Sequence, residues 1–378
     1  MRPSAYHDDS TGKNKIDRHR STALSLFFFL GVCIGVVVSE RLYVQSVESQ
    51  THQGRRVMRT SDGTTKHHLG GGLGTLFTQQ QQQTQSNNNE LQSLLEDVAP
   101  GGEVMIVISN ANLLKTTALL MWLDCARRLP SLTNWLVVAI DEELRDYCVQ
   151  NNINHYYRPV VIPDSQKDTG DNHAVSAMKF EIIEEFLALG WNVLLSDVDV
   201  VIVQDPFQYL YRDSDVEGMT DGYDDGTAYG EMYGVDDPSM GWSRYAQGSR
   251  HMALNSGLFY LTAGAKTIQL MKRIAQRVRT EKVWDQSVYN EELFFLSHGD
   301  YKSTQCSVRV MDREKFMNSK YLFKTVRKIH GGKKPPPVMV HVNYHPDKED
   351  RMRAVIGYYL DGDEKALDPF PGGSEPGT

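Results

Sequence analysis

The densest chemical signal in the chain is VLLSDVDVVIV, residues 193–203, in which eight of eleven residues are aliphatic. Its two carboxylates, Asp197 and Asp199, are two positions apart, and in an extended strand that spacing puts both side chains on one face. An unpaired carboxylate in apolar surroundings costs several kcal/mol, so we expect these two to be paired or metal-bound. Oxygen ligands suit a hard divalent cation, whose shell diphosphate oxygens would complete. The alternative is two aspartates that cap turns at a strand end.

Two later segments add polar groups beside apolar runs. A small polar trio precedes a predicted strand and consists of Asn255, Ser256 and Gly257. Gly257 permits close backbone approach to a ligand. Asp285 and Gln286 then stand at the start of a predicted helix, where the aspartate would also suit the N-cap.

A histidine ends the last apolar run of the chain. Val338–Val340 reads as a short strand, and His341 follows it directly. A histidine at such a position is placed to complete a metal site whose other ligand is Asp199. Taken alone, a histidine of this kind is more often structural than a ligand.

The elements that must position these groups alternate between strand and helix. Residues 104–108, 135–140 and 193 onward predict buried strands, and residues 113–130 and 174–189 show helical spacing of apolar residues. This order predicts a parallel α/β core, in which ligands bind beyond the carboxyl ends of the strands. Asn110, Asp141 and Asp197 would all lie on that edge and are candidates to contact a ligand.

Lys179 lies at the edge of the buried face of the helix predicted over residues 174–189. A cation there would reach the diphosphate oxygens of a bound ligand. The alternative, a lysine whose stem packs on apolar surface while its head reaches water, fits the sequence equally well.

The first hundred residues do not read as a fold. Residues 21–39 carry no charge and are long enough, at about 1.5 Å per residue, to cross a bilayer. Basic residues precede this stretch, which predicts a cytosolic tail at 1–20 and a signal anchor rather than a cleaved signal peptide. Polar and glycine-rich tracts predict a flexible, disordered stem at 40–100. Residues 101–378 then form one luminal domain.

Composition narrows the function. With 40 basic and 48 acidic residues, a net charge of −8 and 40% hydrophobic residues, the chain is typical of a globular protein and untypical of a nucleic-acid binder. Beyond the membrane segment lie Cys125, Cys148 and Cys306, an odd number that allows one disulfide at most; three buried thiols are the alternative.

The sequences of these motifs, and their order along the chain, resemble those of a known family. LGWNVLLSDVDVVIVQDPF, LNSGLFYL, WDQSVYNEELFF and HVNYHPDKEDRM are similar to glycosyltransferase family 77, nucleotide-diphospho-sugar transferases of plants and algae with a GT-A type, Rossmann-like fold. HVNYHPDK and the ending ALDPFPGGSEPGT resemble the branch that arabinosylates hydroxyproline in extensins. The resemblance covers about residue 104 to the C-terminus.

The resemblance implies a UDP-sugar donor, Mn²⁺ or another divalent cation, and retention of anomeric configuration. Asp199 and His341 would be metal ligands, and Asp197 would contact the ribose or donor sugar and the metal through water. Asp285, Gln286 and Lys179 would act at the donor sugar, and the acceptor would be a hydroxyproline-rich glycoprotein or wall glycan. The architecture implies a single-pass type II protein of the Golgi membrane.

Between Asp213 and Asp237 the chain has nine acidic residues and no lysine or arginine, with tyrosines interleaved. One interpretation is a solvated loop. The other is an acceptor-binding lip, in which aromatic rings stack on sugars or proline rings and carboxylates steer a basic rod. On that second interpretation, neutralising Asp224 and Asp225 raises the acceptor KM.

Other functions fit the same residues. A metal-dependent hydrolase of nucleotide sugars would use these carboxylates to activate water, with His345 as the added base. A membrane-tethered carbohydrate-binding protein without activity is a second alternative. Within the transferases, a xylosyl- or galactosyltransferase acting on a wall polysaccharide remains open.

Overall fold

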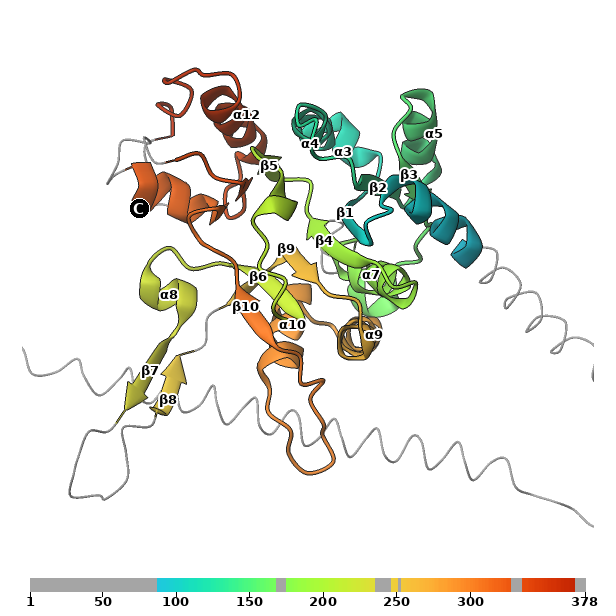
Figure 1. The fold of residues 1–378 in the computed structure, drawn as a ribbon, viewed down its shortest axis with the longest axis vertical. Helices are drawn as coiled ribbons and strands as arrows, with labels where there is room; N and C mark the ends of the chain where they lie inside the picture. The colour runs from blue at the N-terminus through green and yellow to red at the C-terminus, as the bar shows by residue number, and fades with distance from the viewer. Residues whose placement is uncertain (1–86, 168–174, 235–245, 251–252, 328–334, 371–378) are drawn as a thin grey trace, which may run out of the picture. The chain divides into compact units, whose positions relative to one another are not determined.

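The computed structural model describes residues 87–167, 175–234, 246–250, 253–327 and 335–370. Contacts divide the chain into units 1–72 and 73–378, and every described residue belongs to the second. That unit is built on a seven-stranded sheet of order β10-β6-β9-β4-β1-β2-β3 (Figure 1). Its strands, in chain order, are β1 Glu103–Ser109, β2 Trp135–Ala139, β3 His155–Tyr157, β4 Asn192–Ser196, β6 Val216–Thr220, β9 Leu254–Leu261 and β10 Val308–Val310.

The predicted α/β class is confirmed, but the sheet is mixed. β1 pairs in parallel with β2 and β4, and β2 with β3, as the alternation of strands and helices predicts. β9 runs antiparallel to both β4 and β6, which inserts one reversed strand into the sheet. The polar trio Asn255, Ser256 and Gly257 therefore lies inside β9 rather than before it.

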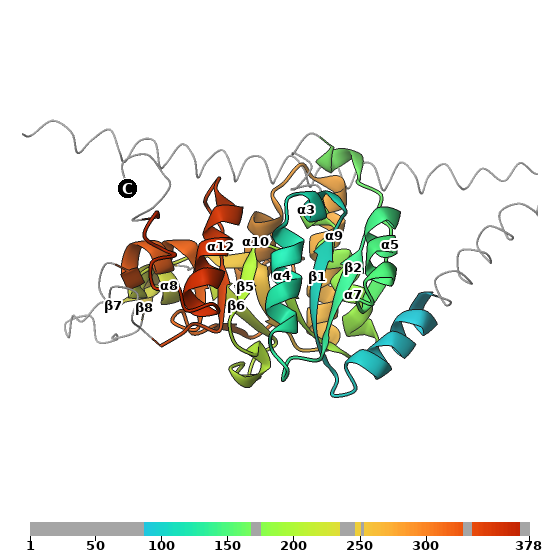
Figure 2. The same cartoon turned by 90° about the horizontal axis from the view of Figure 1, so that it is seen from above.

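Helices cover both faces of the sheet (Figures 1 and 2). One core contains apolar residues of α4, α5 and α12, and the other contains those of α7, α9, α10 and residues 91–99. The helices are α3 Asn112–Lys115, α4 Ala118–Arg127, α5 Glu142–Gln150, α7 Lys179–Ala188, α8 Asp225–Tyr229, α9 Ala265–Thr280, α10 Asp285–Phe294 and α12 Lys348–Tyr359, with a π-helix at Tyr321–Val326. The three cysteines beyond residue 86 are free thiols.

The helix predicted over residues 113–130 is in fact two helices. Thr117 has φ 65°, a left-handed conformation that β-branched residues rarely adopt, and it separates α3 from α4. Arg353 of α12 donates to the Thr117 hydroxyl at 2.9 Å. The apolar spacing predicts helix correctly but carries no signal for this break.

The strand predicted from residue 193 onward is also interrupted. β4 ends at Ser196, and β5, Val200–Ile202, belongs to a separate three-stranded sheet of order β11-β12-β5. The other two strands are β11 Phe316–Asn318 and β12 Met339–His341. β7 Glu231–Gly234 and β8 Ala246–Arg250 form a separate hairpin.

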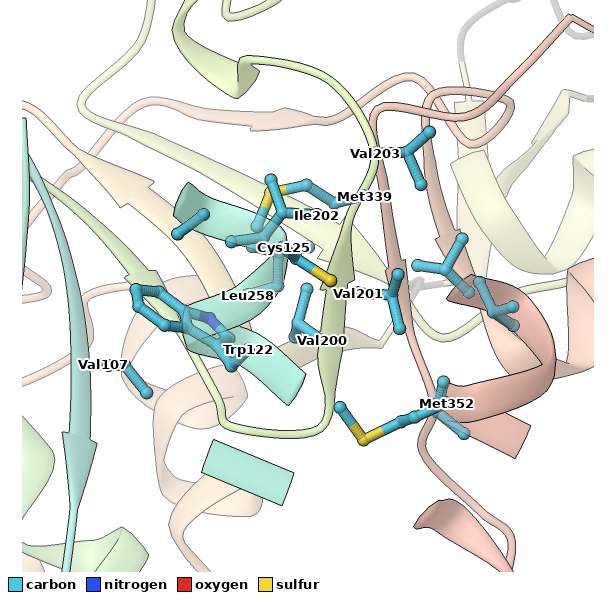
Figure 3. Close-up of a cluster of buried hydrophobic side chains, with 14 of the residues drawn as sticks. Val107, Trp122, Cys125, Val200, Val201, Ile202, Val203, Leu258, Met339 and Met352 are labelled. Atoms are coloured by element: carbon cyan, nitrogen blue, oxygen red, sulfur yellow. The ribbon is translucent and has the colours of Figure 1, made fainter. Parts of the chain in front are cut away.

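A buried cluster fixes β5 beside the main sheet (Figure 3). Val200, Val201 and Ile202 are fully buried with Trp122 of α4 and Met339 of β12. The Trp122 ring also donates from Nε1 to the Ser196 hydroxyl at 2.9 Å, directly at the end of β4. The turn over residues 197–199 is therefore held at both ends by packed strands.

The predicted stem boundary at residue 100 is too late. Residues 87–98 form a helix, and Leu91, Leu95 and Ala99 are fully buried against the sheet. The polar tract just before it hides this narrow stripe of i, i+4 spacing in the sequence. The predicted membrane anchor at 21–39 lies outside the described residues, within which no helix is long and apolar enough to cross a membrane.

Candidate active site

The turn between β4 and β5 brings Asp197 and Asp199 to His341. One ligand atom from each of the three lies within 4.8 Å of the others. The backbone N–H of Asp197 donates to the Gly257 carbonyl at 2.7 Å, and β5–β12 pairing sets His341 opposite Val200. The aspartates converge because they lie in a turn between two sheets, so the predicted single strand with both on one face is wrong in its geometry.

Asp199 is the most strongly compensated carboxylate of the group. Its Oδ1 lies 3.0 Å from His341 Nε2, and its Oδ2 accepts from Lys348 Nζ at 2.7 Å. Burial alone would raise the pKa of Asp199, but the charges of His341 and Lys348 hold it well below its usual range. Among the described residues Asp197 has no such hydrogen-bonded cation, and burial raises the pKa of its carboxyl despite the nearby Lys179.

These three residues fit a divalent cation. Two carboxylates and an imidazole are the donor types that Mn²⁺ accepts. His341 Nδ1 is buried and has no hydrogen-bond partner among the described residues, so one ring nitrogen stays uncommitted. The close packing at Gly257 supports the same interpretation: a Cβ built there would lie 2.4 Å from Asp197 Oδ2 and 2.6 Å from His341 Cε1. Only glycine leaves these ligands in place.

Lys179 is neither snorkelling nor exposed; it forms a buried ion pair with Asp285. Their charged atoms are 2.8 Å apart, and the two side chains are 2% and 4% exposed. Asp285 Oδ2 also accepts from the hydroxyls of Ser176 at 3.0 Å and Ser256 at 3.1 Å. Burial would raise the pKa of Asp285, but Lys179 and the Ser176 hydroxyl lower it. Trp284, not Asp285, occupies the N-cap of α10, so Asp285 is free to make these contacts.

Two residues of the site, Lys348 and Asp221, were not predicted from the sequence. Lys348 begins α12 and reaches Asp199, as described above. Asp221, at the end of β6, accepts from the side-chain amides of Asn255, Gln286 and Asn343. The acidic segment that begins at Asp213 includes Asp221, but nothing in that pattern sets Asp221 apart from the other acidic residues.

All these groups line one cleft of about 920 Å³. Asn110 borders it, with a buried Oδ1 that has no partner among the described residues. Asp141 does not: its carboxylate caps α5 through Leu144 N and accepts from Ala111 N, so it holds the loop after β1 instead. The exposed rings of Trp284 and Tyr344 stand at the same cleft.

The acidic segment is mostly structural where it is described. Asp213 pairs with Arg309, Asp215 binds Ser307, and Glu217 is fully buried. Asp224 caps α8, so its neutralisation would loosen that helix and would not report on acceptor binding alone. Asp236 and Asp237 lie outside the described residues.

A second cleft of about 670 Å³ borders this segment. The exposed rings of Tyr211 and Tyr229 line it, and Arg309 stacks over the Tyr211 ring at 4.2 Å. Arg313 stacks over Tyr229 at 5.6 Å and pairs with Asp225 at 2.8 Å. The cleft runs beside β10, the edge strand of the main sheet.

Known proteins resemble the chain over this domain. Residues 130–355 match the sequence model of nucleotide-diphospho-sugar transferases. The chain is 47% identical to Arabinosyltransferase RRA2 of Arabidopsis thaliana over 286 residues, 75% of this chain and 66% of the relative. It is 43% identical to Arabinosyltransferase RRA1 of the same plant over 288 residues, 75% of this chain and 70% of the relative.

Among solved structures, that of the galactosyltransferase LgtC with donor and acceptor sugar analogs superposes with a TM-score of 0.42 at 13% identity, over 68% of this chain and 96% of that one. That likeness is too weak to support an inference.

The chain belongs to the nucleotide-diphospho-sugar transferase family. Within it, the most similar relatives named above are arabinosyltransferases, which confirms the predicted resemblance to family 77 and to its arabinosyltransferase branch. The predicted enzyme class, a glycosyltransferase, is confirmed with it. The chain spans about two thirds of these relatives' length.

Proposed function

We propose that this enzyme transfers L-arabinofuranose from UDP-L-arabinofuranose to arabinosides on hydroxyproline-rich wall glycoproteins, with retention of configuration. The observation that carries a metal-assisted transfer is the convergence of Asp197, Asp199 and His341 at a cleft that also holds a buried Lys179–Asp285 pair. The transferred sugar rests on the relatives named arabinosyltransferases. The acceptor rests on the resemblance of HVNYHPDK and the ending ALDPFPGGSEPGT to the extensin branch. A single-pass anchor at 21–39 in the Golgi membrane completes the proposal.

The residues of the cleft divide the work. Asp199 and His341 would hold a divalent cation, which supplies charge neutralisation for the departing diphosphate. Lys348, which is 46% exposed at the cleft, would also bind the diphosphate. Lys179 fixes the Asp285 carboxylate toward Ser256, so that this carboxylate faces the donor sugar in one orientation. Gln286 borders the same space.

The acceptor has room in the second cleft. Its tyrosine rings suit the faces of proline rings in an extended polyproline helix, a form with no internal hydrogen bonds. Asp221 borders the first cleft and Asp225 the second, and four residues of chain span about 14 Å at most. A rod-like acceptor a few residues longer than its reacting unit would therefore reach both.

A panel of donors tests the proposal. The secreted domain from residue 87 is incubated with Mn²⁺, individual UDP-sugars and a hydroxyproline-rich peptide carrying short arabinosides. We expect the mass gain of one pentosyl residue with UDP-L-arabinofuranose alone, and none for Asp199→Ala. A gain with UDP-xylose or UDP-galactose would replace the donor, and UDP release without product would indicate a hydrolase. No UDP release from any donor would contradict the proposal.

A further inference from the structure

One carboxylate in the cleft, that of Asp221, accepts hydrogen bonds from three side-chain amides. Asp221 Oδ1 accepts from Asn255 Nδ2 at 2.9 Å and from Asn343 Nδ2 at 3.1 Å. Asp221 Oδ2 accepts from Gln286 Nε2 at 2.6 Å. The three amides come from β9, from the first turn of α10 and from the residues after β12, so Asp221 joins three segments that border the donor cleft.

Two of these amides are also fixed at their other end. Asn255 Oδ1 accepts from the Gly257 N–H at 2.7 Å, and Asn343 Oδ1 accepts from the Ser319 N–H at 3.3 Å. Gln286 differs, because within the described part of the chain its Oε1 has only a long contact of 3.5 Å to the Ser256 N–H. The strong bond to Asp221 therefore decides which end of the Gln286 amide remains available to the cleft.

We propose that Asp221 is a positioning residue that holds the Gln286 amide with its carbonyl oxygen, rather than its NH₂ group, available to the donor sugar. A carboxylate accepts and does not donate, so only the NH₂ end of Gln286 can face it. A carbonyl oxygen held at the cleft stabilises positive charge that develops at the anomeric carbon, and an NH₂ group there opposes it. This inference rests on the proposed glycosyl transfer.

The competing role for Asp221 is purely structural, as a tie between three segments. Replacement by asparagine separates the two roles because it keeps the shape. The substituted asparagine would keep its oxygen toward Asn255 and Asn343, since the opposite orientation would break two hydrogen bonds. Its new NH₂ group would then face Gln286, whose amide must turn over and direct its own NH₂ group to the cleft.

The Asp221→Asn variant should therefore fold normally and lose turnover. We expect kcat to fall at least about tenfold while the KM for the UDP-sugar changes less than about twofold, a split that a loosened cleft would not give. Asp146→Asn, at an exposed aspartate paired with Arg145, is the matched control and should leave both constants unchanged. Wild-type kcat in Asp221→Asn would overturn the proposal.

A second substitution, at Gln286, should restore an oxygen atom that faces the cleft. In the double variant Asp221→Asn, Gln286→Glu, one oxygen of the substituted glutamate accepts from the substituted asparagine, and the other oxygen faces the cleft. Gln286→Glu alone instead sets two carboxylates at the 2.6 Å contact, where like charges repel. We expect the double variant to exceed both single variants in kcat, and absence of any recovery would overturn the proposal.

Urea unfolding tests the same geometry without turnover. Asp221→Asn alone should barely move the midpoint, Gln286→Glu should lower it, and the pair should regain most of the loss. If the two effects simply add, the proposal is wrong. Should the wild type transfer no sugar from any donor, the proposed function fails, while this unfolding cycle still tests whether Asp221 sets the orientation of the Gln286 amide.

Discussion

At the scale of single residues, Gly257 limits how the metal group is built. Its N–H is fixed by Asn255, its carbonyl accepts from Asp197 N, and its missing side chain leaves room for two ligands. A methyl group there would meet Asp197 Oδ2 at 2.4 Å and His341 Cε1 at 2.6 Å, and these atoms would have to move. The position needs glycine for close approach of side chains, not for an unusual backbone angle.

We therefore expect Gly257→Ala to weaken Mn²⁺ binding at least about tenfold, a loss of the size that is typical when groups that orient metal ligands are removed. Isothermal titration of the purified protein with Mn²⁺ measures it. Gly101→Ala is the matched control, because a Cβ there has nothing within 4 Å. Equal Mn²⁺ affinity in both variants would show that the cation is held elsewhere.

Most residues of the candidate site, and the pairing of His341 with Asp199, could be predicted from the sequence, but not the partners Lys348 and Asp221. Asp197, Asp199, His341 and Asp285 all border one cleft, and the apolar strands and the helix start that flank them make them recognisable in the sequence. Asp221 could not be singled out, because it is one of nine acidic residues between Asp213 and Asp237, and only the fold brings the amides of three other segments to it.

At the scale of elements, the interruptions between α3 and α4 and between β4 and β5 have no local signal in the sequence. Residues 193–203 contain no glycine or proline, so the sequence predicts one strand, yet β5 leaves the main sheet to pair with β12. Tertiary packing decides the break, since Val200–Ile202 gain full burial in the smaller sheet. The antiparallel β9 is likewise set by its long-range partners β4 and β6.

The second cleft, beside the edge strand β10, is the proposed binding site for the acceptor. Tyr211 is 50% exposed in the second cleft, and its ring stacks under Arg309. Tyr211→Ala should raise the KM for a peptide of about 12 residues, ~37 Å long as a polyproline helix, several-fold more than for a peptide with one modified hydroxyproline. Initial rates over a range of each acceptor measure the two constants.

Tyr223→Ala is the control for this comparison, because Tyr223 is 43% exposed in the same segment but is not part of either cleft lining. A similar rise in both KM values, or a rise in the control as well, would remove the second cleft from acceptor binding.

At the scale of the whole molecule, the folded unit begins before the boundary that composition suggests. The helix over residues 87–98 buries Leu91 and Leu95 completely against the face that α7 and α9 also cover. Removal of one such leucine side chain typically costs about 2–5 kcal/mol. The glutamine-rich tract before the helix and the three asparagines that begin it conceal its role.

A chain that starts at Gly101 should consequently be much less stable than one that starts at residue 87. We expect a melting temperature lower by about 4 °C or more, or loss of soluble protein, since 1 kcal/mol shifts a domain of this size by about 2–4 °C. Thermal unfolding followed by circular dichroism compares the two. Identical melting curves would mean that the helix is dispensable.

The central claim is that Asp197, Asp199 and His341 hold a divalent cation on which sugar transfer depends. The most direct measurement is the initial rate of pentosyl transfer after chelation with EDTA, followed by a titration with Mn²⁺, in the wild type and in Asp199→Asn. We predict that chelation abolishes transfer, that Mn²⁺ restores it in the wild type, and that Asp199→Asn stays at least about 100-fold slower at saturating Mn²⁺. Transfer that survives chelation, or a wild-type rate in Asp199→Asn, would contradict the account.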